Sequence, residues 1–163
     1  IVRSSDGHSW TTVAAGTPYP ASAAVCLNTL LSFKGRLWTI GGQNYAGTTF
    51  YPHVYYSSDD GVTWTTATTT APWGSYPSLM CGWADDHHMY LAGGYNGSLT
   101  PKYSAALWRS SDGITWENVN PKLAGTTSGM AFHSVGKLRG RTLIFGSNNT
   151  SSAAYLKSAY SWR

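Results

Sequence analysis

The chain has 163 residues and a net charge of +4; 11% of its residues are charged, 42% hydrophobic and 14% aromatic, and 18 are glycine. Disordered chains are richer in charge and poorer in aromatic residues, and helical proteins are richer in Leu, Glu and Lys, so this composition favours an all-β fold with many turns. The basic residues are scattered except at Lys137, Arg139 and Arg141, and no segment is long and apolar enough to span a bilayer. We therefore expect neither nucleic-acid binding nor membrane insertion.

In chain order, the first distinctive segment is Ser4–Trp10, which contains Asp-Gly and ends in tryptophan. The next residues predict four antiparallel strands: Val25–Phe33, Leu37–Ile40, Val54–Tyr56 and a strand from Thr63. A turn at Lys34-Gly35 joins the first two strands, and a glycine pair follows the second. Asp-Gly between two strand-like runs is a strong hairpin signal, so we expect the third and fourth strands to form a hairpin.

The same order of segments recurs along the chain. An apolar run ending in two small residues appears at Leu37–Gly42, Met89–Gly94 and Thr142–Ser147, with spacings of 52 and 53 residues between Gly41, Gly93 and Gly146. The segment around Asp-Gly appears at Ser4–Trp10, Ser57–Trp64 and Ser110–Trp116. Repeats of this length with four strands each predict the blades of a β-propeller.

The two ends of the chain complement each other in this repeat. Ser158–Arg163 matches Ser104–Arg109, but the Ser-Ser-Asp-Gly that follows Arg109 has no counterpart after Arg163. Arg3 and the residues after it supply that sequence at the N-terminus. We therefore expect a single propeller unit over residues 1–163, with blades over about 21–68 and 77–120 and a third blade split between 1–20 and 126–163.

These residues resemble two known propeller repeats. The apolar run ending in Gly-Gly, with a tryptophan some 22 residues later, is similar to the kelch repeat. The turn at Ser57–Trp64 resembles the Asp-box, or bacterial neuraminidase repeat, of pattern Ser-x-Asp-x-Gly-x-Thr-Trp; the other two copies are one residue shorter. The resemblance implies that the Asp bonds the turn backbone and the Trp packs into the blade, a structural role for Asp6, Trp10, Asp59, Trp64, Asp112 and Trp116.

Three blades are too few to close a ring, since propellers have about four to eight. A strand donated by a second copy would complete the split blade, so we expect a homodimeric six-bladed ring with two-fold symmetry. The alternative is that the chain is an excerpt of a longer propeller.

One side of such a propeller gathers aromatic and amide residues. The loops from the second to the third strand, and those between blades, would open there and carry the candidate ligand-binding residues Asn44, Tyr45, Trp73, Tyr76, Tyr95, Asn96, Tyr103 and Asn148. Flat aromatic rings beside hydrogen-bonding amides suit a recognition surface, and a carbohydrate fits that chemistry. We expect about half of the aromatics to pack between blades instead.

The seven acidic residues argue against catalysis. The sequence places none of them in a loop of that side, whereas glycoside hydrolysis needs two carboxylates flanking the scissile bond. Asp85–His88 contains metal-ligand residue types but reads as a hairpin turn, so no metal and no cofactor are expected. Cys26 and Cys81 leave a disulfide and free thiols equally open.

The sequence thus predicts a non-enzymatic, lectin-like recognition module, presented outside a cell or on a virion. Its expected partners are a second copy of itself and a glycan or other cell-surface ligand. The alternatives are a protein-interaction propeller and, less favoured, a sialidase-like glycoside hydrolase fragment.

Overall fold

The computed structural model describes residues 1–13, 17–20, 25–120, 130–139, 141–148 and 156–162. Within these ranges the chain is all-β and contains no helix, and so no helix that could cross a membrane. The strands are β1 (Val2–Arg3), β2 (Thr11–Thr12), β3 (Val25–Cys26), β4 (Thr29–Phe33), β5 (Arg36–Ile40), β6 (Gln43–Asn44), β7 (Val54–Ser57), β8 (Thr65–Thr68), β9 (Ser78–Ala84), β10 (Met89–Tyr95), β11 (Leu107–Ser110), β12 (Glu117–Asn120), β13 (Met130–Leu138), β14 (Arg141–Asn148) and β15 (Leu156–Trp162).

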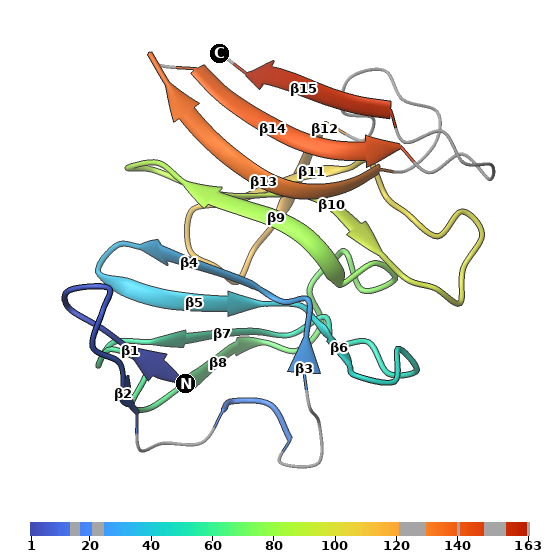
Figure 1. The fold of residues 1–163 in the computed structure, drawn as a ribbon. Helices are drawn as coiled ribbons and strands as arrows, with labels where there is room; N and C mark the ends of the chain where they lie inside the picture. Colours follow the sequence, from blue (N-terminus) through green and yellow to red (C-terminus); the bar gives the residue numbers. More distant parts are fainter. Residues whose placement is uncertain (14–16, 21–24, 121–129, 140, 149–155, 163) are drawn as a thin grey trace.

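Three larger antiparallel sheets are stacked along the molecule (Figure 1). The first sheet has the order β4-β5-β7-β8 and the second β9-β10-β11-β12. In both sheets the spatial order of the four strands is their order along the chain. The third sheet, β13-β14-β15, has three strands. β4 packs beside β9, and β9 beside β13, so the first strands of the three sheets are neighbours.

The strand from residue 25 differs from its prediction. It divides into β3 and β4 at Leu27, whose φ of 60° lies outside the extended region. Leu79, the second residue of β9, also has a positive φ, of 53°. A leucine with a left-handed backbone thus stands just before β4 in the first sheet and near the start of β9 in the second.

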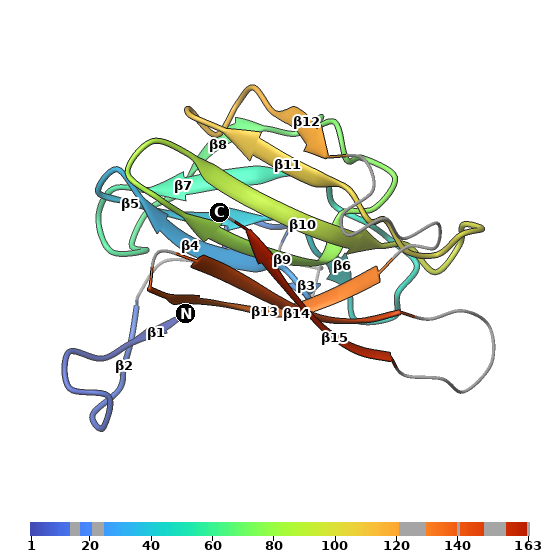
Figure 2. The ribbon, with the colours of Figure 1, turned by 90° about the horizontal axis from the view of Figure 1, so that it is seen from above.

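The N-terminal hairpin, β1 with β2, is separate from the third sheet. Val2 pairs with Thr12 and Arg3 with Thr11, while β15 pairs with β14. Figure 2 shows the hairpin projecting from the body, and in Figure 1 the two termini lie at opposite ends of the stack. Within one chain, the strand after Asp6 thus pairs with β1 rather than with the segment that ends near Arg163.

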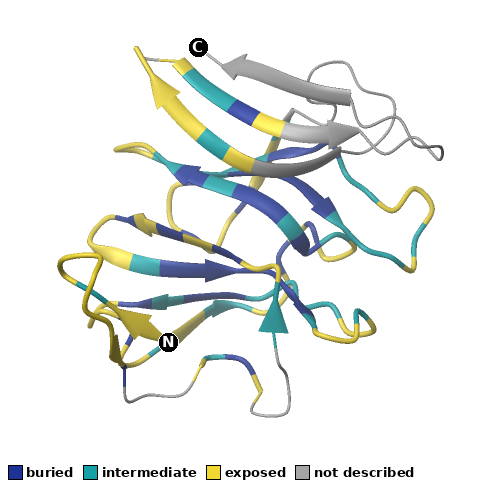
Figure 3. Ribbon diagram, viewed as in Figure 1, coloured by how far each residue is buried: buried dark blue, intermediate teal, exposed yellow. Residues whose placement is uncertain are grey.

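Two apolar clusters hold the sheets together. Alternate residues of a strand point to opposite faces, so the second sheet, in the middle, contributes to an interface on each of its faces. The first cluster joins the first and second sheets through residues that include Leu31, Trp38, Ile40, Met89 and Leu91. The second joins the second and third sheets through Cys81, Trp83, Ala92, Leu107 and Ile144. Figure 3 shows this burial in the middle of the stack and exposed residues on the N-terminal hairpin.

The backbone conformation and close packing after β5 and in β10 require glycine pairs at these places. Gly42 and Gly94 have φ values of 119° and 133°, a region that residues with a Cβ rarely adopt. A Cβ on Gly94 would also overlap the backbone of Tyr76, and one on Gly41 the backbone of Pro77. The pairs therefore let the chain leave one sheet while the segment leading to the next sheet passes close by.

Candidate functional site

The connections divide between two sides of the molecule (Figure 1). The β4–β5, β7–β8 and β9–β10 turns lie on one side, here called the turn side. The loops from β5 to β7 and from β10 to β11 lie on the other, here called the loop side. Most of the candidate binding residues come from segments of the loop side.

Four of the candidate residues come together around the loop from β10 to β11. The rings of Tyr95 and Tyr103 are 5.0 Å apart between centroids and tilted by 46°, and the two residues form an isolated β-bridge. The Tyr76 hydroxyl donates a hydrogen bond of 2.9 Å to the carbonyl oxygen of Pro101. Nδ2 of Asn96 donates one of 2.8 Å to the carbonyl oxygen of Ser75. All four side chains are half-buried, so part of each tyrosine ring remains accessible at the surface.

Asn44 and Tyr45 belong to the loop after β5. Oδ1 of Asn44 accepts hydrogen bonds from the backbone N–H groups of Thr48 and Thr49, at 2.9 and 3.0 Å, so the amide mainly shapes its own loop. Tyr45 is 86% exposed. A ring that open is available to a ligand without any rearrangement.

A buried serine ties the two loops together. Oγ of Ser78 lies 3.0 Å from Oε1 of Gln43 and 2.9 Å from the carbonyl oxygen of Tyr95. Ser78 is fully buried and Gln43 is 7% exposed. The bases of the two loops are therefore held in a fixed relation, which sequence reasoning missed because a lone serine carries no motif.

Trp73 is not on the surface. It is 3% exposed, and its ring stands edge-on to those of Trp116 and Trp108, at 4.8 and 6.1 Å between centroids. The residue belongs to the apolar cluster between the first and second sheets, so it cannot contact a ligand directly. The side chain of Asn148 lies outside the described residues.

A second aromatic group fills the space beside the first sheet. The ring of Tyr19 is edge-on to those of Tyr51 and Tyr55, and its hydroxyl donates a 2.6 Å hydrogen bond to the carbonyl oxygen of Gly41. Burial raises the pKa of Tyr19 to about 12. Nδ1 of His53 lies 2.7 Å from the Tyr55 hydroxyl, and burial lowers the pKa of this histidine. The group is a packing cluster, which the scattered tyrosines of the sequence did not reveal.

The three Asp-Gly turns share one hydrogen-bond pattern. The serine that opens each turn donates to the carboxylate of Asp6, Asp59 or Asp112, at 2.8, 2.8 and 3.0 Å. That serine also accepts the N–H of the turn glycine, at 2.8 Å in each case. The longer copy accommodates its extra residue at Asp60, whose φ is 57°.

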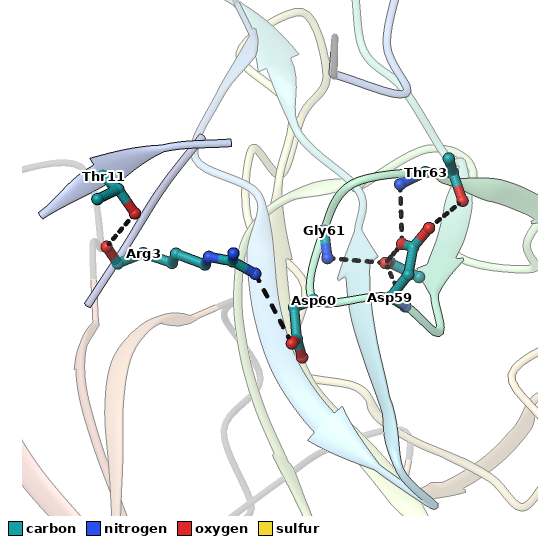
Figure 4. A network of polar contacts seen from close by, with 7 residues as sticks. Arg3, Thr11, Asp59, Asp60, Gly61 and Thr63 are labelled. Carbon is teal, nitrogen blue, oxygen red and sulfur yellow. Dashed lines mark hydrogen bonds and ion pairs between the residues drawn. The ribbon is translucent and has the colours of Figure 1, made fainter. Parts of the chain in front are cut away.

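The carboxylates are committed to these turns. Asp59 accepts the hydroxyl of Thr63 at 2.6 Å and its N–H at 2.8 Å, and these bonds lower the pKa of Asp59 to about 2 (Figure 4). Two backbone N–H groups, those of Ser9 and His8, hold the pKa of Asp6 well below its ordinary value. A carboxylate held ionised by its own turn is a poor proton donor.

The remaining acidic residues are also away from the loop side. Oδ1 of Asp85 accepts the N–H groups of His87 and His88, as in a hairpin turn, with Asp86 beside it. Glu117, in β12, is paired with Arg109 at 2.7 Å. Within the described ranges, no group of three or more His, Cys, Asp or Glu residues could hold a metal ion. Cys26 and Cys81, both described, are free thiols.

No protein-family model matches the chain, and a search of curated proteins found no match to it.

Proposed function

We propose that this protein is a non-enzymatic recognition module that binds carbohydrate through its loop side. The observation that carries the proposal is the half-exposed Tyr95–Tyr103 pair, together with exposed Tyr45, on a side whose described segments contain no carboxylate. Aromatic faces stack on the C–H face of a sugar, and the amides and hydroxyls beside them can bond its hydroxyl groups.

The carboxylate positions support binding rather than hydrolysis. A glycosidase acts through two carboxyl groups about 5–10 Å apart on either side of the bond that breaks. Here Asp6, Asp59 and Asp112 are bonded within their own turns, on the side opposite the loops. A pair flanking a sugar on the loop side would have to come from other residues.

The architecture proposed with this function is a β-propeller with kelch-like and Asp-box repeats. In it, each larger sheet is a blade, and the N-terminal hairpin supplies the fourth strand of the third blade of a second copy. Two chains then make a six-bladed ring with several equivalent loop sites, which raises the avidity of weak single-site binding. Such multivalent display suits an extracellular, virion or cell surface.

The test is binding of the intact protein and two single variants to an array of immobilised glycans. Tyr45→Ala and Tyr95→Ala should each weaken binding about fivefold, since an aromatic contact contributes roughly 1 kcal/mol. Ile114→Ala is the matched control, because Ile114 is 58% exposed in the Asp112 turn on the opposite side.

The outcomes separate the alternatives. Equal loss in all three variants, or no loss in the two tyrosine variants, would contradict the assignment of the loop side. Inert glycans together with a specific protein partner would point to a protein-interaction propeller, and hydrolysis of a chromogenic sugar would point to an enzyme.

A further inference from the structure

We propose that the face of the first sheet turned away from the second is an interface for a second copy of this chain, and that Leu30 packs there over the partner's Gly136. The inference rests on the propeller architecture of the proposed function and names the contact that would close the ring. We call the face of the first sheet that is turned away from the second the entry face. The exit face is the face of the third sheet that is turned away from the second.

The strand pairings fix which residues of the three sheets are equivalent. Leu31 pairs with Trp38 in the first sheet, Trp83 with Tyr90 in the second, and Gly136 with Leu143 in the third. Trp38, Tyr90 and Leu143 each stand three residues before the first small residue of the repeat, at Gly41, Gly93 and Gly146, so the three pairs are equivalent. Leu31 and Trp83 both point into the next sheet, and their equivalent in the third sheet is Gly136.

The two interfaces within the chain pair a large residue with a small one at this place. Thr29 and Leu31 of the first sheet pack over Gly82 of the second, where a Cβ would overlap the threonine side chain and come within 3.1 Å of the leucine side chain. Trp83 of the second sheet belongs to the cluster against which Val135 of the third packs. The place taken by Gly82 and Val135 is held in the first sheet by Leu30. A partner's Gly136 facing Leu30 would repeat the pairing of Leu31 with Gly82, with the large and small residues exchanged.

The exit face carries apolar residues that are buried at equivalent places elsewhere. Phe33 and Ile40 of the first sheet are 4% and 0% exposed, because the second sheet covers them. Their equivalents in the third sheet, by the same register, are Leu138 and Phe145, which are 64% and 47% exposed. Among the residues that the structure describes, a Cβ on Gly136 would meet nothing within 4 Å. The exit face of the described third sheet therefore exposes Leu138 and Phe145 beside the polar Ser134 and Arg141, and is notched at its glycine.

The entry face is open at Leu30 and carries Leu37 beside the polar Ser32 and Thr39. Leu30 is 63% exposed although it lies in the middle of β4. A cavity of about 430 Å³ lies beside it, lined by residues that include Val2, Leu37, Thr39 and Trp64. In the interface between the first and second sheets, Phe33 and Trp38 of the first sheet are buried in the shared apolar cluster. The cavity is thus shaped for the exit face of a sheet like those within the chain.

The N-terminal hairpin lies where the outer strand of a preceding sheet would lie. It lines the same cavity and contacts the first sheet through Arg3 and Asp60, 3.8 Å apart (Figure 4). Trp10 of the hairpin is 60% exposed, whereas its equivalent Trp116 is 7% exposed. A partner's third sheet placed on the entry face would therefore adjoin the hairpin and cover its tryptophan. Since the entry and exit faces lie at opposite ends of the stack, two copies can satisfy both faces at once.

The experiment measures the mass of the full chain in solution by size-exclusion chromatography with light scattering. One chain has a mass of 17.6 kDa, so two give twice that value. Gly136→Leu should halve the measured mass, because the added side chain would collide with Leu30 of the partner subunit. In a single chain the same side chain has room, so folding, followed by circular dichroism, should be unchanged.

The double variant decides between this contact and a general weakening. Adding Leu30→Gly to Gly136→Leu removes the side chain with which the new one collides. The double variant should therefore regain the doubled mass. Ile114→Asp is the control, because Ile114 is exposed on the turn side and should leave the mass unchanged.

A folded wild-type monomer would overturn the inference, as would a dimer indifferent to Gly136→Leu or a double variant that stays monomeric. A monomer that still binds glycans through Tyr45 and Tyr95 would overturn only this inference and leave the recognition function standing. A mass above two chains would also overturn it, because the faces would then join without closing a ring.

Discussion

The indole of Trp73 stands edge-on to the indole of Trp116, with 4.8 Å between the ring centroids and 85° between the ring planes. Trp73 comes from the segment that leads into the second sheet, and Trp116 from the turn before β12. The contact therefore fixes the outer strand of the second sheet to the chain that precedes the sheet. The Nε1–H of Trp73 is buried and has no hydrogen-bond partner among the described residues, where the ring contributes packing alone.

Replacing Trp73 by Ala should destabilise the protein by about 3–5 kcal/mol, the usual cost of removing a buried aromatic ring. Trp73→Phe should cost clearly less, because it keeps a ring and removes the unpaired N–H. Urea unfolding followed by tryptophan fluorescence measures both. A Trp73→Ala variant with wild-type stability and lost ligand binding would contradict the burial of this residue.

Gly113 and Gly35 make a matched pair of turn glycines. Their φ values are 78° and 70°, so alanine at either should cost about 1–2 kcal/mol through the backbone. A Cβ on Gly113 would also overlap the ring of Trp38, whereas one on Gly35 would meet nothing within 4 Å. Gly113→Ala should therefore lose about 1–3 kcal/mol more than Gly35→Ala in thermal or urea unfolding. Equal losses would mean that the Asp112 turn does not pack on Trp38.

Acid should weaken the protein through its turn carboxylates. The pKa of Asp59 is lowered from 3.8 to about 2, first by the hydroxyl of Thr63, so the ionised form stabilises the fold above pH 4 and this contribution disappears as pH falls towards 2. Asp59→Asn should lower Tm at pH 6 and flatten the fall of Tm between pH 4 and pH 2. Thermal melts across that range test the sign, and an unchanged slope in the variant would refute it.

The two thiols should differ in reactivity. Burial raises the pKa of Cys81 to about 11, so at pH 8 about one molecule in a thousand carries the thiolate that reacts with a disulfide reagent. Cys26 is half-exposed in β3. In single Cys→Ser variants, the chain that keeps Cys26 should be labelled much faster by a coloured disulfide reagent than the chain that keeps Cys81. Similar rates in the folded protein would show that the second sheet opens readily.

Period and turn chemistry predicted the order of the strands well. The structure contains the predicted strand of Leu37–Ile40, the hairpin turn at Lys34-Gly35 and the hairpins at the Asp-Gly turns. These features depend on apolar alternation and on left-handed turn residues, which act over only a few neighbouring positions. The sequence pattern placed the end of the strand at the glycine pair, whereas β10 continues to Tyr95, which pairs with Ser78. That extension depends on pairing with the far end of β9, 17 residues earlier in the chain, so the pattern around the glycine pair does not reveal it.

The candidate site was predicted less well, for a related reason. Loop composition singled out Trp73 and Tyr95 alike, but Trp73 is in the core and Tyr95 is half-exposed. Which aromatic turns inward depends on the partner that reaches it, here Trp116 from the turn before β12. The role of Ser78 between the two loops also depends on atoms brought together by the fold.

Because the acidic turns lie away from the loops, ligand binding at the loops should depend little on ionic strength. In the described loop segments, Lys102 is the only side chain with a full charge; the other described Lys, Arg, Asp and Glu residues lie in strands or on the turn side. Mobile ions screen attraction between charged groups but leave stacking and neutral hydrogen bonds nearly unaffected. A ligand held at the loops should therefore remain bound in concentrated sodium chloride, with its affinity little changed from that in dilute buffer.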